Sequence, residues 1–390
     1  MEKKSRRKAV VEELFYSSGI KINGNDPWDI QVHNPRFYKR ILIDGLLGVG
    51  ESYMDGDWDA ERLELTAYKV CTAGLDRQGI KSWRNVAHAA VVKLMNLQTK
   101  KRSKKVGEKH YDIGNELYEM MLDKYMTYSC AYWHQSKKTP EGAKNIDEAQ
   151  VAKLDLICRK IGLKTNDRVL DIGCGWGSFL KYAAEEYGVQ GVGITISKEQ
   201  AELARKRCAG LPVEIRLQDY RDVNDHFDHI ISIGMFEHVG PRNYQAYMRA
   251  VHRNLKNDGL FLLHTVGQHT SEIRNDPWSH KYIFPNSQSP SLKQIARASE
   301  KLFHIEDVHS FGIDYAPTLE AWYKNFSSNW NKIKELTNGN GERKYDERFR
   351  RMWDYYLLIA QGFAMSQKIS LWQIVLSKNG VEEGYKSIRY

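Results

Sequence analysis

The chain has 390 residues, which is enough for one large domain with a smaller one beside it. An apolar fraction of 42%, with 22 Tyr and 10 Trp, excludes a disordered protein, and no apolar run approaches the roughly 18 to 20 residues of a membrane-spanning helix. The net charge of +9 favours a polyanionic partner, which could be nucleic acid or anionic lipid.

The N-terminus and the cysteines point to a cytoplasmic protein. Residues 1–7 are basic, like the start of a secretory signal, but Glu12 and Glu13 interrupt the apolar stretch that such a signal requires. The five cysteines show no spacing typical of a metal site or a redox pair. We therefore expect free thiols in a reducing compartment and no bound metal.

The first hundred residues are predicted to be mostly helical, with turns at 24–27 and around 45–50. A basic cluster at 100–105 follows, either as a linker or as the start of the next domain. These features predict a helical N-terminal domain at residues 1–100 and a larger domain at residues 101–390.

Strands and helices alternate through the larger domain. Apolar spacing predicts a helix at 147–161, and later helices end near Tyr187, Cys208 and the Asp258–Gly259 turn. Seven strands are predicted, at 168–171, 189–196, 213–217, 229–234, 260–266, 303–311 and 369–377. This order predicts a doubly wound α/β sheet, which binds ligands at the carboxyl ends of its strands.

A glycine-rich loop joins the first strand to its helix, with the sequence Asp171-Ile172-Gly173-Cys174-Gly175-Trp176-Gly177. A nicotinamide or flavin site, or a plain tight turn, could use such a loop, but the glycines are too closely spaced for the usual dinucleotide pattern. An acid directly before them suits a cationic, sulfonium-bearing amino acid better than a pyrophosphate. The loop resembles motif I of class I S-adenosylmethionine methyltransferases, so the sheet is expected to be a Rossmann-like methyltransferase sheet.

The ends of the next two strands extend the predicted cofactor site. The second strand ends at Thr195 and Ile196 without the acid that usually holds a ribose, so Gln200 is a candidate for that role. Its capping-box spacing with Ser197 is a structural alternative. After the third strand, Asp219-Tyr220 could contact the adenine amino group or form a surface turn.

The loop after the fourth strand bears on the acceptor of the methyl group. Enzymes that methylate exocyclic amines of bases carry an Asn/Asp-Pro-Pro-aromatic turn there, and this chain has none. It has Glu237 and His238 instead, which could form a general-base site or a polar loop. We therefore expect no nucleic-acid partner, despite the positive charge.

An ordered set of motifs makes a resemblance specific. The motifs lie at residues 48–56, 128–133, 169–177, 191–197, 217–222, 234–240 and 262–265. Together they resemble the cyclopropane-fatty-acyl-phospholipid synthases over nearly the whole chain. The related mycolic-acid cyclopropane synthases lack the N-terminal segment, so the phospholipid branch fits better.

The resemblance implies cyclopropanation of cis double bonds in phospholipid acyl chains, with S-adenosylmethionine as methyl donor and S-adenosylhomocysteine as product. The alkene attacks the methyl carbon and leaves a carbocation, and loss of a proton from the transferred methyl group closes the ring. An alkene is a weak nucleophile and needs alignment, a cation in an apolar pocket needs electron-rich neighbours, and the base must act with water excluded. In this family the base is a bound bicarbonate ion.

The resemblance also assigns residues. At the bicarbonate it places Cys130, Glu237, His264, Tyr315 and the backbone of Val266, of which the cysteine, the histidine and the tyrosine would otherwise be read as packing residues. It makes Tyr128, Ser129, Gly173, Thr195, Gln200 and Asp219 cofactor contacts. The predicted cofactor site further includes Asp171, Cys174, Gly175, Gly177, Ile196 and Tyr220.

A lipid substrate implies docking on an anionic bilayer, peripherally at the inner face of the cell membrane. The cluster at 100–105 could contribute about 1 kcal/mol for each basic residue, or remain a solvated linker. The N-terminal domain is expected to serve a lipid surface or a dimer interface, since the family forms homodimers. The late aromatic residues could line an acyl channel or form core; they are Trp322, Tyr323, Phe326, Trp330, Trp353, Tyr355 and Tyr356.

Two other functions remain open from the sequence. One is a C-methyltransferase that acts on another lipid or small molecule without closing a ring. The other is a non-catalytic nucleic-acid-binding module, against which the intact cofactor loop argues.

Overall fold

The computed structural model describes residues 2–75, 113–272 and 276–390, which form two compact units. The N-terminal unit contains Met1–Met95, Ile273–Pro285 and Tyr315–Lys368, and the sheet unit contains Asn96–Glu272, Asn286–Asp314 and Ile369–Tyr390. Two late segments therefore belong with the N-terminal helices, although the sequence analysis placed them in the larger domain. The basic cluster at 100–105 lies outside the described residues.

The N-terminal unit is mainly helical, as predicted. Its helices are α1 (Glu2–Tyr16), α2 (Arg36–Asp44), α3 (Leu46–Met54), α4 (Leu63–Thr72), α13 (Pro277–Tyr282), α15 (Tyr315–Ile333) and α16 (Glu347–Met365), and β1 (Gln31–Val32) pairs with β2 (Trp58–Asp59). The turn predicted around 45–50 is confined to Gly45, at φ 59°, and α3 begins directly after it. Gly48 then lets α3 approach α2, since a Cβ there would lie 2.3 Å from the Arg40 carbonyl oxygen.

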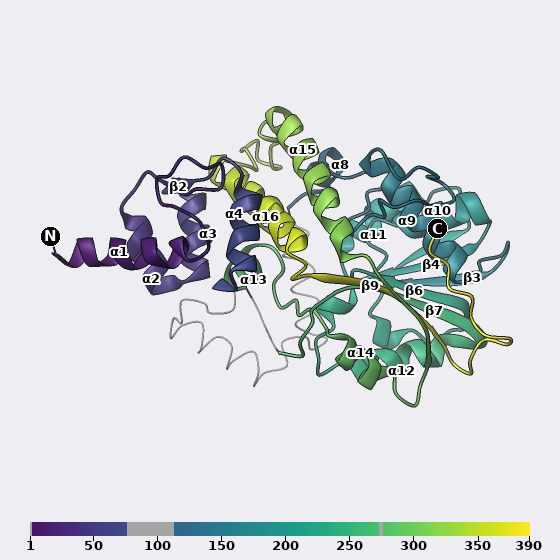
Figure 1. The fold of residues 1–390 in the computed structure, drawn as a ribbon. Coiled ribbons are helices and arrows are strands. Elements are labelled where there is room, and N and C mark those ends of the chain that lie inside the picture. The colour runs from purple at the N-terminus through teal and green to yellow at the C-terminus, as the bar shows by residue number, and fades with distance from the viewer. Residues whose placement is uncertain (1, 76–112, 273–275) are drawn as a thin grey trace. The chain divides into compact units, whose positions relative to one another are not determined.

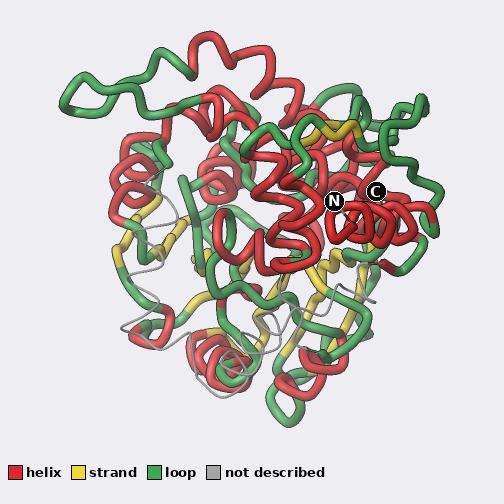
Figure 2. The backbone as a smooth tube through the Cα atoms, turned by 90° about the vertical axis from the view of Figure 1, so that its left-hand side faces the viewer, coloured by secondary structure: helices red, strands yellow, loops and turns green. Residues whose placement is uncertain are grey.

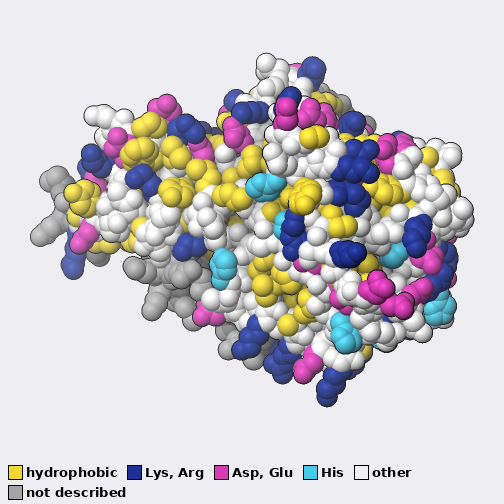
Figure 3. All heavy atoms as spheres, turned by 45° about the vertical axis from the view of Figure 1, so that its right-hand side comes forward, with side chains coloured by type: hydrophobic (Ala, Val, Ile, Leu, Met, Phe, Trp, Pro, Cys, Tyr) yellow, Lys and Arg dark blue, Asp and Glu magenta, His cyan; other side chains and the backbone are white. Residues whose placement is uncertain are grey.

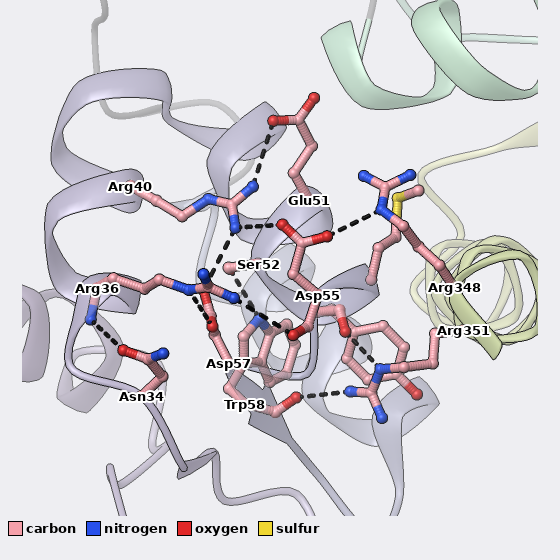
Figure 4. Close-up of polar contacts among 12 residues, drawn as sticks. Asn34, Arg36, Arg40, Glu51, Ser52, Asp55, Asp57, Trp58, Arg348 and Arg351 are labelled. Carbon is pink, nitrogen blue, oxygen red and sulfur yellow. Dashed lines mark hydrogen bonds and ion pairs between the residues drawn. The ribbon is translucent and has the colours of Figure 1, made fainter.

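An ion-pair network ties the 48–56 motif to α16 within this unit (Figure 4). Arg40 Nη1 lies 2.7 Å from Asp55 Oδ2 and 3.3 Å from Asp57 Oδ2. From α16, Arg348 Nε donates to Asp55 Oδ1 at 2.9 Å and Arg351 Nε donates to the Tyr53 carbonyl at 2.5 Å. These pairings give the N-terminal motif a structural role, because they join it to a helix almost 300 residues later in the chain.

Replacing Gly362 by alanine should destabilise the N-terminal unit. A Cβ at this position in α16 would lie 2.4 Å from the Glu64 carbonyl oxygen and 2.6 Å from Ala67 Cβ in α4, so the helices would have to separate. We expect a loss of about 1–3 kcal/mol in the free energy of unfolding, measured by urea denaturation. Gly339→Ala is the control, since no atom lies within 4 Å of a Cβ there. Equal stability of the two variants would contradict the close packing of α4 on α16.

The sheet unit contains a seven-stranded sheet in the order β5-β4-β3-β6-β7-β9-β8 (Figure 1). The strands are β3 (Arg168–Ile172), β4 (Gln190–Thr195), β5 (Val213–Leu217), β6 (Phe227–Ile233), β7 (Leu255–Gly267), β8 (His304–Ser310) and β9 (Ser370–Ser377). Strand β9 runs antiparallel to both of its neighbours, and the five strands from β3 to β7 are parallel. The predicted doubly wound sheet is confirmed.

One predicted boundary in the sheet is wrong. The turn expected at Asp258–Gly259 lies inside β7, which begins at Leu255. The pairing of β6 with β7 is irregular there, and a Cβ at Gly259 would lie 2.2 Å from the Asp228 carbonyl oxygen. A glycine that reads as a turn in the sequence therefore serves a close approach between two strands.

Helices cover both faces of the sheet (Figure 2). On one face, α12 (Tyr244–Asn254) and α14 (Leu292–Ser299) pack in a core with Phe261 and Leu263. On the other, α9 (Ile146–Lys160), α10 (Ser178–Tyr187) and α11 (Lys198–Arg207) pack in a second core with Leu262. Alternate residues of β7 thus point to opposite faces, as the period of a strand requires. Helix α8 (Asn115–Met121) and the short helices η1 (Tyr220–Asp222), η2 (Phe236–His238) and η3 (Gly312–Asp314) lie in the connections.

No helix formed by the described residues combines the length and the apolar character needed to cross a bilayer.

Candidate active site

The glycine-rich loop follows β3 at the carboxyl edge of the sheet. Gly173, Gly175 and Gly177 have φ values of 84°, 53° and 79°, which side chains disfavour. The N–H groups of Gly173 and Cys174 both donate to the Ile194 carbonyl of β4 at 3.0 Å. The loop is therefore fixed against the end of the neighbouring strand, where a ligand would bind.

Asp171 lies in β3, two residues before Gly173, and is 2% exposed. Burial raises the pKa of its carboxyl to about 7, although the charge of Lys153 partly opposes the shift. Its Oδ1 atom is buried and has no hydrogen-bond partner among the residues that the structure describes. A buried carboxylate oxygen without a donor is rare, and it suits a cationic group of a ligand.

Thr195, at the end of β4, contacts Gln200, in the first turn of α11. Thr195 Oγ1 donates to Gln200 Oε1 at 2.9 Å, and both residues are buried. Ser197 caps α11 by accepting from the Gln200 N–H at 3.3 Å. Ser197 therefore caps the helix as the capping-box spacing predicted, but the Gln200 side chain bonds to Thr195 and does not complete the box. Ile196 lies between these residues, directly after the strand.

Asp219 follows β5 and has a cationic partner that the sequence analysis missed. Its Oδ1 accepts from the N–H of Arg221, and its Oδ2 lies 2.7 Å from Arg221 Nη2. The same guanidinium lies 5.3 Å from the ring centroid of Tyr220. In the sequence, this pair is indicated only by the spacing of two residues between an acid and an arginine in a polar turn.

The segment 127–130 reaches the same edge of the sheet. Ser129 Oγ accepts from Lys153 Nζ at 2.7 Å, and a Cβ on Gly234 would lie 3.9 Å from Ser129 Cβ. The Cys130 thiol is buried and donates to the Ala131 carbonyl at 3.3 Å.

Tyr128, the other predicted cofactor contact of this segment, reaches the glycine loop through an aromatic chain. Its ring packs edge-on against Tyr118, with centroids 5.1 Å apart. Tyr118 lies 4.8 Å from Trp176 of the glycine loop.

Glu237 lies in η2, where the chain leaves β6. Its Oε1 accepts from the Val266 N–H at 2.5 Å, which is the backbone group that the resemblance assigned to bicarbonate. Its Oε2 is buried and forms no hydrogen bond of standard geometry in the described part of the chain. Burial raises the carboxyl pKa to about 7, although an interaction with the Thr265 side chain partly opposes the shift. Burial also lowers the pKa of the neighbouring His238 to about 4, so that imidazole is neutral.

His264 lies on β7, two residues before Val266, and its carbonyl accepts from the Gly234 N–H at 2.9 Å. Burial and the charges of Lys153 and Lys160 lower its pKa well below the usual value, so the ring is neutral. Its Nδ1 lies 3.3 Å from Gln373 Nε2. With the Gln373 amide nitrogen as donor, Nδ1 accepts and the ring proton lies on Nε2, which is buried and has no partner among residues 2–75, 113–272 and 276–390.

Tyr315 begins α15 and belongs to the N-terminal unit, so its part in the site stays a prediction. The late aromatic residues belong to the same unit. Within it, Trp353 stacks on Phe349 with centroids 5.5 Å apart and lies 6.3 Å from Phe326. These contacts show that Trp353 and Phe326 form core, whatever other role they have.

Removing the Arg389 side chain should loosen the segment that carries Cys130. Both guanidinium Nη atoms of Arg389 lie 2.5 Å from the carboxylate oxygens of Asp307, and the Arg389 carbonyl accepts from the Tyr132 hydroxyl. Arg389→Ala removes both guanidinium hydrogen bonds from the buried Asp307, which keeps the hydrogen bond from the Ser387 hydroxyl at 2.9 Å. We therefore expect a loss of about 1–3 kcal/mol in the free energy of unfolding in urea and faster hydrogen exchange at 130–133. The exposed Lys386→Ala is the control. Unchanged exchange in Arg389→Ala would contradict this role.

The sheet topology, the glycine loop and the acid at the end of β3 together define the class I methyltransferase fold. A family model described as mycolic acid cyclopropane synthetase matches residues 98–374. The chain therefore belongs to this family of cyclopropane synthases.

Relatives extend the match to the whole chain. The chain is 50% identical over 380 residues to a cyclopropane-fatty-acyl-phospholipid synthase of Escherichia coli K12, which covers 97% of this chain and 95% of that protein. The solved structure of the cyclopropane synthase MmaA2 from Mycobacterium tuberculosis is 28% identical, with a TM-score of 0.62, and covers 73% of this chain and all of that one. A structure of the mycolic acid cyclopropane synthase CmaA1 with SAH and CTAB is 30% identical, also with a TM-score of 0.62, and covers 70% and 98%.

Proposed function

We propose that this chain uses S-adenosylmethionine to convert cis double bonds of phospholipid acyl chains into cyclopropane rings. The observation that carries the proposal is the pair of buried atoms Glu237 Oε2 and His264 Nε2 at the edge where β6 and β7 end, neither of which forms a hydrogen bond of standard geometry with the described residues. The similarity to the E. coli phospholipid enzyme over almost the whole chain supports the same activity.

The cofactor fits the edge formed by β3, β4 and β5. Asp171 Oδ1 would accept from the ammonium group of the methionine part, and Gln200 and Asp219 would hold the ribose and the adenine. The positive φ values of the loop glycines leave the backbone open to close approach. The similar CmaA1 was solved with SAH, which supports the same assignment here.

Bicarbonate fits the two buried atoms Glu237 Oε2 and His264 Nε2. An ion with one O–H donor and negatively charged oxygens needs one acceptor and one donor, which Glu237 Oε2 and His264 Nε2–H supply. Cys130 and Tyr315 are the remaining proposed ligands, while Val266 orients Glu237 through its N–H. When bound, S-adenosylmethionine supplies the methyl group and bicarbonate takes up the proton that ring closure releases.

The protonation states of His264 and Glu237 suit this chemistry. His264 stays neutral, so it donates a hydrogen bond and does not bring a second cation near the carbocation. Glu237 has a pKa of about 7, so its carboxylate can accept a hydrogen bond or a proton near neutral pH. Both side chains are buried, which keeps water away from the reacting atoms.

A membrane lipid as substrate supports peripheral attachment from the cytoplasm at the inner face of the cell membrane, and the resemblance of the chain to its family supports a homodimer. Basic and acidic side chains are both spread over the face shown in Figure 3, so the attraction to anionic lipid is assigned to the net charge of +9. In the N-terminal unit, Val10, Tyr16 and Ile43 are exposed apolar side chains that could enter the lipid surface.

The test is to incubate the purified protein with S-adenosylmethionine, bicarbonate and vesicles of cis-monounsaturated phosphatidylglycerol, and to weigh the released acyl chains. We expect each product chain to gain one CH2 and lose its alkene. A gain of CH2 with the alkene retained would replace the proposal by methylation without ring closure. No gain on any unsaturated phospholipid would overturn the lipid assignment.

A further inference from the structure

A lysine is buried in the middle of α9, among the residues that form the site. Lys153 is 0% exposed, which is rare for a lysine unless it has partners. Its Nζ donates to Ser129 Oγ at 2.7 Å. Other buried residues of α9 are buried by apolar packing, since Leu154 and Ile157 belong to the core between α9 and the sheet. Lys153 instead points its charge at the segment that carries Ser129 and Cys130.

A second residue of α9 holds the same segment without a charge. Gln150, three positions earlier and on the same face of the helix, donates through Nε2 to the Ser129 carbonyl at 2.9 Å and to the Thr127 carbonyl at 3.3 Å. Ser129 is therefore held by its side chain from Lys153 and by its backbone from Gln150. Gln150 thus holds the segment without a charge, whereas Lys153 both holds the Ser129 side chain and supplies a charge.

The charge of Lys153 is shared among four titratable groups from three other parts of the sheet unit. Asp123 and Cys130 come from the segment after α8, Asp171 from the end of β3 and His264 from β7. Burial lowers the pKa of Lys153 to about 8, whereas Asp123, Cys130 and Asp171 favour its charged form. In turn, Lys153 lowers the pKa of Asp171 and of His264.

Asp123 is the acid that favours the charged form of Lys153 most, but its carboxylate also has two backbone donors, so Asp171 depends more on the lysine. Asp123 Oδ1 accepts from the Thr127 N–H at 2.7 Å and its Oδ2 accepts from the Tyr125 N–H at 2.8 Å. Asp171 has one buried oxygen without a donor in the described residues, and Lys153 is the cation that acts on it. Without that cation, a buried carboxylate would take up a proton to avoid an uncompensated charge.

We propose that Lys153 is a positioning residue for the cofactor: its buried ammonium holds Ser129 beside Gly234, in the connection after β6, and compensates the charge of Asp171, so that Asp171 is ready for the ammonium group of the bound cofactor. This role rests on the proposed function of the same site. Lys153 lies in α9, a helix that contains none of the sequence motifs. It connects the proposed cofactor site with the part of the site that contains Cys130 and His264.

The test compares the binding of S-adenosylhomocysteine to the full-length wild type, Lys153→Met and Lys153→Gln by calorimetry between pH 6 and pH 9. In the wild type the affinity should fall as the pH drops below about 7, because Asp171 takes up a proton. Both variants should bind about tenfold more weakly at pH 7, and the pH midpoint of their binding should move upward, because Asp171 has lost the cation that favours its charged form.

Gln150→Met is the matched control, since it removes the hold on the Ser129 backbone and leaves the charge in place. It should weaken binding without moving the pH midpoint, and Lys153→Arg should keep the midpoint of the wild type. If Lys153→Met does not fold, Lys153→Gln still gives the answer, because it keeps a polar side chain of similar length. Wild-type affinity and midpoint in a folded Lys153 variant would overturn the inference, while a wild type that does not bind the ligand would overturn the proposed function itself.

Discussion

Glu237→Gln should lower kcat by about 10²–10³-fold while leaving the affinity for S-adenosylhomocysteine unchanged. Glutamine keeps the size of the side chain and can still accept from the Val266 N–H through its carbonyl oxygen. The second position, however, becomes an amide that donates, where the site needs an acceptor for the O–H of bicarbonate. Loss of a positioned proton acceptor costs a factor of this size.

The pH dependence of the same variant gives a second readout. Burial raises the Glu237 pKa to about 7, so the accepting carboxylate is lost as the pH falls through this value. The wild-type kcat should therefore rise with pH up to slightly above 7, and the Gln variant, at equal bicarbonate concentration, should lack this rise. A variant that keeps more than about a tenth of the wild-type kcat would show that Glu237 does not act on the proton acceptor.

Asp171→Asn should weaken the binding of S-adenosylhomocysteine by about 10- to 100-fold. The buried Oδ1 atom would no longer carry a charge to meet the ammonium group of the cofactor, and a charged hydrogen bond contributes about 1.5–3 kcal/mol. The binding of the variant should also be independent of pH near 7, where the wild-type Asp171 titrates. Titration calorimetry at several pH values measures both effects.

The stability of the Asn variant distinguishes binding from folding. Burial is the largest cause of the raised Asp171 pKa, so ionisation of this group opposes folding above the usual pKa of an aspartate. A neutral Asn should therefore leave the free energy of unfolding at pH 8 unchanged or raise it. Weaker ligand binding together with lower stability would indicate a damaged fold and would leave Asp171 without its proposed role at the cofactor.

The sheet could be predicted because its strands follow local rules. Buried parallel strands are short apolar runs, and the glycine loop after β3 fixes where the first strand ends. The predictions failed at glycines that serve packing, since Gly48 and Gly259 read as turns but allow two chain segments to approach. The grouping of 315–368 with the N-terminal helices could not be predicted, because it depends on contacts between segments far apart in the sequence.

The site shows the same division. Glu237 and His264 lie at the ends of predicted strands, and the structure brings both to one edge, with the Val266 N–H as a link. Lys153 and Arg221 were missed, because a lysine on a helix and an arginine in a polar turn look like solvated residues in a sequence. Their partners become visible only when the buried neighbours are known.

Cyclopropanation requires that a methyl group is transferred to an alkene and that a proton is then removed from that same methyl group. Methyl-deuterated S-adenosylmethionine tests it directly, with cis-monounsaturated phospholipid vesicles as substrate and mass spectrometry of the acyl chains. We expect a product without an alkene that retains two of the three deuterium atoms, because the third leaves when the ring closes. A product that retains all three would show that the methyl group is transferred and stays intact, which contradicts cyclopropanation by this site.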